Sequence, residues 1–380
     1  MRRSLGIGVI GTGWMAKAHA RALSVLNAVA DLPVRVELVG LAGRDPDRTR
    51  HRAEQWGFAR HTADWRTLVE DPRVDMVVNV AGNDVHAEPS IAALAAEKYV
   101  LCDKPLAIDV GERSAMEAAA RRSSAVAVCG YNYRFVPALQ VARRMFRAGD
   151  FGALRHLSLA YEQDWASPAV ARSGWRFEDD RGGSCVYDLS HILDLLHWLC
   201  EVPEAVSGTR GTLSELGGTR PVQPGCDPED SFLTHAALPS GATAALQASR
   251  IATGHKGHQC IELIGSAGSF RWDMEEINTL WVATSSPADG VGKGRRRHLL
   301  VTEMDDPYMS NWYAPGHGIG WDDTIIHQWL DMIAAILRHD GQRQFAGFDD
   351  GALALTFADS IRESAAERRW VRVPHPEPRP

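Results

Sequence analysis

The sequence lacks any long apolar run. No segment approaches the roughly 20 apolar residues that a membrane-spanning helix needs. The first three residues, Met1-Arg2-Arg3, lead directly into a short apolar stretch and not into a signal-peptide core. We therefore expect a cytoplasmic protein without a membrane partner.

Cysteine pairs with redox or metal-binding spacing are also missing. The six cysteines are scattered, none forms a C-x-x-C pair, and several lie within apolar runs. We expect reduced core thiols, and we predict neither a disulfide framework nor a metal site.

Concentrated positive charge is absent too. The formal net charge is -7 at pH 7, and the arginines are dispersed. The one basic run, residues 295–297, follows a glycine-rich segment, and we expect it to be a solvated loop. This charge balance argues against a nucleic-acid partner.

A repeated strand and helix pattern occupies the first third of the chain. With 380 residues and 45% hydrophobic content, the chain is long enough for two domains. Apolar runs at residues 5–10, 36–42, 74–80 and 126–130 alternate with helical stretches. This alternation predicts an α/β, Rossmann-type domain with a doubly wound, mostly parallel sheet over residues 1–133.

A glycine turn follows the first predicted strand. In the G-T-G-W-M-A motif at residues 11–16, Gly11 permits a tight turn, Gly13 lets the backbone approach a pyrophosphate, and Ala16 keeps the helix close to the strand. Strand, glycine turn and helix are the context that a dinucleotide fingerprint requires. The free N–H groups and positive dipole end of the helix would then bind phosphate.

The end of the second predicted strand leaves the choice of dinucleotide open. This position normally carries the acid that binds the adenosine ribose, and here it reads Gly43-Arg44-Asp45-Pro46. Arg44 could stack on adenine or meet a 2′-phosphate, and Asp45 could cap the helix that follows. The pattern is compatible with NAD and with NADP.

Lys104 stands out because the chain has only five lysines against 36 arginines. It follows the apolar run at residues 99–102, at the carboxyl end of a predicted strand, where open α/β sheets place their chemistry. Pro105 restricts the residue before it and so favours one direction for the lysine side chain. The alternative is a solvated lysine before a proline turn.

The second half of the chain predicts a different sheet. Several apolar runs follow one another with hairpin-like turns. We therefore predict an α+β domain with a largely antiparallel open sheet over residues 134–373, followed by a disordered, proline-rich tail at residues 374–380. Helices predicted at residues 321–337 and 350–367 close this domain or pack back on the first one.

Two polar residues interrupt an apolar, helix-like stretch after the first strand of this second sheet. Asp188 and His191 are three positions apart, so we expect them on one face of a helix. Histidine has an unperturbed pKa of about 6.5 and suits proton transfer near neutrality, although a core histidine is the alternative. We expect His197 in packing and His19 on a helix surface.

Five motifs together resemble the Gfo/Idh/MocA oxidoreductases, the family of glucose-fructose oxidoreductase and inositol dehydrogenase. G-T-G-W-M-A, A-G-N-D-V-H, C-D-K-P, Y-N-Y-R-F-V-P and G-G-S-C-V-Y-D-L-S-H-I-L-D occur in the family's order over nearly the whole chain. Y-E-Q-D-W and S-G-W-R are similar to a branch of pyranoside and anhydrosugar dehydrogenases. Two departures are Asp103, which replaces the usual Glu, and the three-residue separation of Asp188 from His191, which is four in many relatives.

The resemblance implies an NAD(P)-dependent dehydrogenase that oxidises a secondary ring hydroxyl of a sugar, glycoside or cyclitol. His191 would be the base, Lys104 would hydrogen-bond the same oxygen, and Asp188 would orient His191 or bind a neighbouring hydroxyl. The implied cofactor contacts are Gly11, Thr12, Gly13, Trp14, Met15, Gly43, Arg44, Ala81, Asn83, His86, Asp103 and Lys104. The implied substrate contacts are Lys104, Tyr131, Arg134, Asp164, Trp165, Trp175, Arg176, Asp188 and His191, with Asp194 as a further candidate.

Two other functions stay open at this point. The enzyme could cleave a glycosidic bond through transient oxidation with bound NAD, or the fold could serve as a non-catalytic cofactor or sugar sensor. Net release of NADH separates a dehydrogenase from an eliminating enzyme. Retention of Lys104, Asp188 and His191 together argues against a sensor.

Substrate charge and assembly are the last expectations from the sequence. Acids that rim the site would attract a cationic ligand, so we expect an amine-bearing sugar, such as an aminoglycoside-type pseudo-oligosaccharide in secondary metabolism; solvated surface charge is the alternative. The acids are Glu162, Asp164, Glu178, Asp179, Asp180, Asp227, Glu229 and Asp230.

A sheet face exposing apolar strands such as residues 244–248 would need a partner, which predicts a homodimer or homotetramer.

Overall fold

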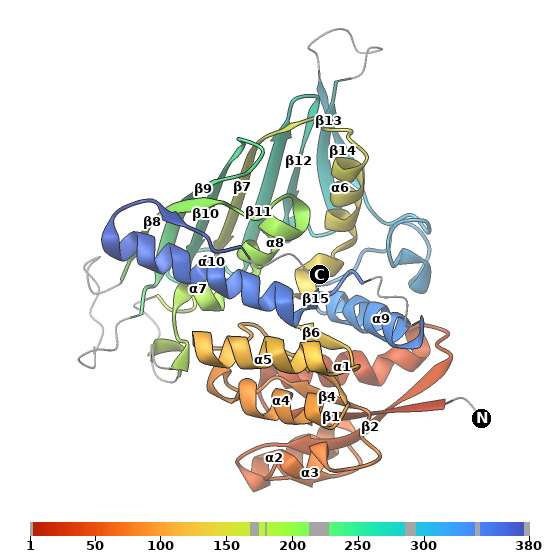
Figure 1. Ribbon diagram of the computed structural model, residues 1–380. Coiled ribbons are helices and arrows are strands. Elements are labelled where there is room, and N and C mark those ends of the chain that lie inside the picture. Colours follow the sequence, from red (N-terminus) through yellow and green to blue (C-terminus); the bar gives the residue numbers. More distant parts are fainter. Residues whose placement is uncertain are drawn as a thin grey trace. The chain divides into compact units, whose positions relative to one another are not determined.

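The computed structural model divides the chain into two compact units (Figure 1). Unit 1 comprises Met1–Phe135 and Gly320–Ala352, and unit 2 comprises Val136–Ile319 and Leu353–Pro380. The structure describes residues 3–167, 175–178, 181–212, 228–285, 294–338 and 343–375.

Unit 1 is built on a seven-stranded sheet in the order β15-β6-β5-β4-β1-β2-β3. Strands β1 to β6 are parallel, as the alternation of strands with helices predicts, and β15 is antiparallel to β6. The sequence pattern did not reveal β3 or β15, because two-residue strands carry no periodicity. The bounds are β1 Arg3–Ile10, β2 Val34–Ala42, β3 His61–Thr62, β4 Met76–Asn79, β5 Tyr99–Cys102, β6 Ala127–Cys129 and β15 Ala346–Gly347.

The helices of unit 1 begin where the sequence supplies caps. Asp45 Oδ1 accepts the N–H of Arg48 at 3.0 Å, which confirms Asp45 as a helix cap, and Asp109 Oδ1 accepts the N–H of Glu112 at 2.8 Å. The bounds are α1 Trp14–Val29, α2 Pro46–Trp56, α3 Arg66–Val69, α4 Ala87–Ala95, α5 Val110–Arg122 and α9 Asp323–Arg338, with short 3₁₀ turns η1 Asn83–Val85 and η2 Asn132–Phe135.

Helix α9 packs on α1 and on the 3₁₀ turn η2, with a buried histidine in each contact. The indole N–H of Trp329 donates to His19 Nδ1 at 3.2 Å, and His327 Nδ1 lies 2.9 Å from the carbonyl oxygen of Phe135. The expectation of a surface His19 was wrong, because α9 covers that face of α1 with Trp329. Burial lowers the pKa of both imidazoles to about 4.

These two histidines predict that unit 1 loses stability in mild acid. Each imidazole binds a proton near pH 6.5 when unfolded but only near pH 4 when folded, so protonation favours unfolding as pH falls through this window. We expect a loss of about 3 kcal/mol per histidine between pH 6.5 and 4. Urea denaturation at pH 7.5, 5.5 and 4.5 measures this loss in the free energy of unfolding. His61→Gln, which replaces an exposed histidine, is the control. If His327→Gln is as acid-sensitive as the wild type, this assignment fails.

Unit 2 contains a nine-stranded sheet in the order β14-β13-β12-β11-β7-β10-β9-β8-β16. It is mostly antiparallel, as the hairpin pattern predicts, and only β7 and β10 pair in parallel among the described strands. The bounds are β7 Leu154–Glu162, β8 Ala205–Gly211, β9 Ser231–Ala237, β10 Thr243–Ser249, β11 His258–Gly265, β12 Gly268–Asp273, β13 Thr279–Thr284, β14 Arg295–Leu300 and β16 Val371–Arg372.

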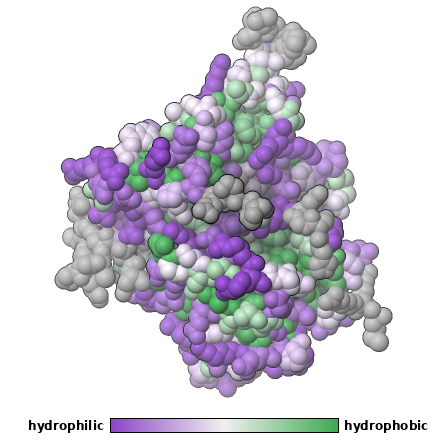
Figure 2. Space-filling model, viewed as in Figure 1, coloured by the Kyte–Doolittle hydropathy of each residue, from purple (hydrophilic) through white to green (hydrophobic). Residues whose placement is uncertain are grey.

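Helices cover one face of this sheet. Helices α6 (Pro137–Arg147) and α8 (His191–Leu199) lie against it (Figure 1), and α10 (Phe348–Glu367) begins in unit 1 and continues in unit 2. Ala244, Leu246 and Ala248 of β10 are buried, and the short helix at Cys185–Asp188 contacts this strand, so the expectation that residues 244–248 expose an apolar strand was wrong. The face in view in Figure 2 is mostly hydrophilic, with apolar side chains interspersed.

Two further local expectations need correction. Residues 295–297 lie in strand β14, not in a loop, because β13 pairs with them and Arg296 forms an ion pair with Glu262 at 3.1 Å. Their exposed charges suit an edge strand. The stretch around His191 is also not one helix, since α7 (Cys185–Asp188) ends three residues before α8 begins.

The described cysteines are free thiols, and Cys226 lies outside the described residues. Within the described part of the chain, no helix is long and apolar enough to cross a membrane.

Candidate active site

The glycine turn of unit 1 forms a cradle at the start of α1. Gly11 has a φ of 121°, and a Cβ there would lie 2.6 Å from the carbonyl oxygen of Val80. At Gly13, by contrast, a Cβ would meet no other described atom within 4 Å. The first turn of α1 has no side-chain cap and no acid within the described residues. A phosphate can therefore reach bare backbone N–H groups at the positive end of a helix.

The end of β2 lies beside this turn. A Cβ on Gly43 would come within 2.6 Å of Thr12 Cγ2, so only glycine allows the two loops to approach this closely. The neighbouring Arg44 side chain is exposed. Asp45 is occupied as the cap of α2, so the ribose acid that this fold usually places here is absent from the strand end.

The loop after β4 and the C-D-K-P turn are joined by a histidine. His86 Nδ1 lies 2.7 Å from the carbonyl oxygen of Pro105, and burial lowers the pKa of this imidazole. Asp103 Oδ1 accepts the N–H of Lys104 at 2.8 Å, which fixes the turn that carries Lys104. The structure thus brings Asn83, His86, Asp103 and Lys104 together at the carboxyl ends of β4 and β5.

Two predicted substrate residues of unit 1 are deeply buried. Tyr131 is 1% exposed. The Arg134 guanidinium lies 3.4 Å from Asp350 Oδ1 and is likewise buried, so its charge takes part in an ion pair within unit 1. Their predicted contact with substrate stays a prediction.

In unit 2, Glu229 holds the N-terminus of α7. Its Oε1 accepts the N–H of Val186 at 3.1 Å and the hydroxyl of Ser184, while Oε2 lies 3.8 Å from Arg362 Nε. This buried carboxylate therefore fixes the short helix that ends at Asp188.

Asp188 and His191 lie among aromatic and charged neighbours. Asp188 Oδ2 is 3.9 Å from Arg176 Nε, and the Arg176 guanidinium lies 4.3 Å from the centre of the Trp175 ring. The His191 ring meets Tyr161 edge-on, with centroids 6.1 Å apart. The helix break places Asp188 at the end of α7 and His191 at the start of α8, so helical periodicity alone does not describe their relation.

Arg250 is a residue that the sequence analysis missed. It is fully buried, its Nε lies 2.8 Å from Asp230 Oδ1, and Nη1 donates to the carbonyl oxygens of Arg176 and Gly183 at 2.7 and 2.6 Å. It thereby holds both ends of the 176–183 segment. The available signal was a single arginine at the end of an apolar strand, paired across the hairpin with an acid.

The remaining predicted side chains of unit 2 are also engaged. Trp165 donates from Nε1 to Gln163 Oε1 at 2.8 Å and packs on Phe177, with ring centroids 5.7 Å apart. Asp164 pairs with Lys256 at 2.6 Å, and this hydrogen bond lowers the pKa of the Asp164 carboxyl. His197 Nε2 lies 3.7 Å from Asp194 Oδ1 within α8.

Most of the acids that were expected to rim a binding site for a cationic ligand form ion pairs inside unit 2. Glu229 and Asp230 are buried and paired, which contradicts a role for them on a pocket rim. Glu162 and Glu178 also have partners, His255 at 3.6 Å and Arg181 at 3.3 Å. Asp179, Asp180 and Asp227 lie outside the described residues.

Comparison with known proteins agrees with this arrangement. Residues 5–131 match the oxidoreductase family with an NAD-binding Rossmann fold, and residues 139–271 match the GFO/IDH/MocA C-terminal domain. Levoglucosan dehydrogenase of Pseudarthrobacter phenanthrenivorans is 31% identical over 98% of this chain and 99% of its own. This chain belongs to the Gfo/Idh/MocA oxidoreductase family.

Solved structures agree with that membership. An oxidoreductase domain protein from Kribbella flavida has a TM-score of 0.91 and 34% identity, covering 98% of this chain and all of its own. Levoglucosan dehydrogenase in complex with NADH and levoglucosan has a TM-score of 0.90 and 31% identity over the same shares. The predicted α/β fold with a second, mostly antiparallel sheet is confirmed.

The family decides the cofactor that the strand end of β2 left open. The protein is an NAD-dependent oxidoreductase. The open space at Gly13 and the uncapped start of α1 fit the pyrophosphate of this cofactor.

Proposed function

We propose that the protein oxidises a secondary ring hydroxyl of a neutral sugar, an anhydrosugar or pyranoside, or of a cyclitol. The observation that carries the proposal is the surrounding of Asp188 and His191 by Tyr161, Trp175 and Arg176. Aromatic faces beside a few fixed polar groups suit a ligand with apolar ring faces and hydroxyl edges. Relatives named levoglucosan dehydrogenase and, from Acidothermus cellulolyticus, inositol 2-dehydrogenase, support the substrate class.

Three side chains divide the work in this proposal. Bound NAD would supply the hydride acceptor for the carbinol carbon. The His191 imidazole takes the hydroxyl proton, and Lys104 Nζ donates a hydrogen bond to the same oxygen as negative charge develops on it. Asp188 orients His191 or accepts a neighbouring hydroxyl of the ring.

A substrate panel tests this function. Levoglucosan, a methyl pyranoside and an inositol are each incubated with NAD, and NADH and product are counted. We expect one NADH per molecule of ketone formed for at least one of them. Glycosidic cleavage without net NADH would instead identify the eliminating reaction, and saturable binding without turnover would identify a sensor.

An amine-bearing, aminoglycoside-type substrate is the narrower alternative from the charge pattern. The described acids have partners, so we expect an amino glycoside and its N-acetylated form to give similar kcat/KM values at low and high salt. A large preference for the free amine that salt removes would restore the cationic substrate. Assembly into a homodimer or homotetramer also stays a prediction.

A further inference from the structure

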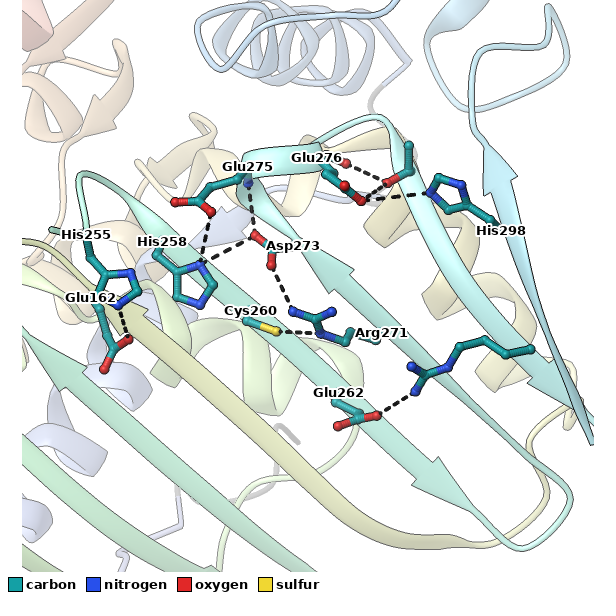
Figure 3. Close-up of polar contacts among 12 residues, drawn as sticks. Glu162, His255, His258, Cys260, Glu262, Arg271, Asp273, Glu275, Glu276 and His298 are labelled. Carbon is teal, nitrogen blue, oxygen red and sulfur yellow. Dashed lines mark hydrogen bonds and ion pairs between the residues drawn. The ribbon is translucent and has the colours of Figure 1, made fainter.

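Histidine and carboxylate side chains gather on the face of the nine-stranded sheet opposite α8 (Figure 3). Tyr161 points toward His191 of α8, so the next residue of β7, Glu162, points to the other face. His258 is the cross-strand partner of Glu162, and Asp273 is the partner of Cys260, two positions further along β11. The register therefore places Glu162, His258 and Asp273 on one face.

Two more side chains complete the cluster. His255 comes from the turn between β10 and β11, and Glu275 comes from the 3₁₀ turn Met274–Glu276 after β12. One ligand atom each of Glu162, His255 and His258 lies within 4.8 Å of the others, and the same holds for His258, Asp273 and Glu275. His258 is thus common to two groups of three.

The spacing within the cluster is too long for hydrogen bonds. Glu162 Oε2 lies 3.6 Å from His255 Nε2, and His258 Nδ1 lies 3.6 Å from Asp273 Oδ1 and 3.8 Å from Glu275 Oε2. His258 Nδ1 is buried and has no hydrogen-bond partner among the described residues. Ligands of a tetrahedral zinc ion, each about 2.1 Å from the metal, lie about 3.4 Å from one another. The separation of Glu162 Oε2 from His255 Nε2 is close to that of two metal ligands.

The turn that carries His255 is fixed before any ion binds. Asp164 Oδ2 accepts the N–H of Gly254 at 3.1 Å and a hydrogen bond from Lys256 Nζ at 2.6 Å. The N–H of Ala252 donates to the carbonyl oxygen of Gln163 at 2.8 Å. The turn is therefore tied to the segment that directly follows Glu162, which limits the ordering needed for binding.

We propose that Glu162, His255 and His258 bind one zinc-type divalent ion. Two imidazoles and one carboxylate form a zinc donor set that leaves the fourth position for water. Glu162 is favoured over Asp273 as the carboxylate ligand. Asp273 accepts hydrogen bonds at both oxygens, from Arg271 and from the N–H of Glu275, whereas Glu162 accepts one from Gln247 at Oε1 and keeps Oε2 for the ion. The ion would take His258 Nε2, and the proton on Nδ1 would then face the nearby carboxylates of Asp273 and Glu275.

The role of the ion follows from its place on β7. It would tie the turn at residues 250–257 to the end of β7, directly behind Tyr161. The ion would therefore cross-link this turn to the sheet, and the NAD cradle in unit 1 shares no residue with it.

Zinc binding to the full chain tests the site. Tag-free protein is stripped with chelator, desalted, titrated with ZnCl₂ and assayed for retained zinc and for the rise of Tm. We expect one zinc per chain, and binding weakened at least tenfold in Glu162→Gln, His255→Gln and His258→Gln. Asp273→Asn should weaken binding roughly 10- to 100-fold as a positioning change. Circular dichroism and NAD affinity show that each variant is folded.

Matched controls are His298→Gln and Glu262→Gln, which change the same residue types on the same sheet outside the cluster. Both should bind zinc like the wild type. The proposal is overturned if the wild type retains no zinc at tens of micromolar, or if the three ligand variants bind it as well as the controls do. If Asp273→Asn loses zinc binding while Glu162→Gln binds zinc like the wild type, the assigned ligand set is wrong.

Discussion

Replacing His191 with alanine should lower kcat roughly 10²- to 10⁴-fold, the usual contribution of a positioned acid–base group. The Kd for NAD should change little, because the phosphate cradle at Gly11 and Gly13 belongs to unit 1. Steady-state kinetics on the best substrate of the panel and a binding titration with NAD measure the two effects separately.

His197→Ala is the matched control for this variant. His197 lies on the same helix, with Nδ1 3.2 Å from the carbonyl oxygen of Leu193, and has no proposed part in proton transfer. It should keep kcat within a few-fold of the wild type. A His191→Ala enzyme that is as active as this control would remove His191 as the base.

Lys104→Ala completes a double-mutant cycle with His191→Ala. Both groups are proposed to act on one oxygen, so removing the second group should lower kcat/KM much less than removing the first. The effects of residues that act as a unit are not additive. If the losses in kcat/KM multiply, the two side chains act independently, and the shared-oxygen mechanism is wrong.

Replacing Arg250 with methionine should destabilise unit 2 by about 3–5 kcal/mol, because it leaves the Asp230 carboxylate buried without its partner. Both side chains of this pair are fully buried. The change also frees the carbonyl oxygens of Arg176 and Gly183, so kcat/KM should fall with stability as the segment near Asp188 loosens. Urea denaturation followed by circular dichroism measures the loss.

The second replacement, Asp230→Leu in the Arg250→Met background, separates charge burial from general disruption. Replacing a whole buried ion pair with apolar groups is often neutral, so the double variant should recover much of the lost stability. Arg296→Met, which breaks an exposed pair with Glu262, should cost less than about 1 kcal/mol. Equal losses in Arg250→Met and Arg296→Met would show that burial does not decide the effect.

The sequence by itself determined the fold class and the dinucleotide cradle. Both depend on local patterns, since apolar runs alternating with helices predict a parallel sheet and the glycines at 11 and 13 act through their own backbone. The C-D-K-P turn and the apolar stretch around His191 were readable for the same reason. Each is a short motif next to a strongly periodic segment.

Only the tertiary structure decided which charges are partners. Three pairs join residues that are distant in sequence: Arg250 with Asp230, Arg362 with Glu229, and Lys256 with Asp164. From composition alone, these acids were a possible binding site for a cationic ligand. Burial of His19 likewise depended on Trp329, which lies on the far C-terminal helix α9. The cluster at Glu162, His255 and His258 exists because strand register aligns β7 with β11, and register is set by long-range pairing that no single stretch of sequence encodes.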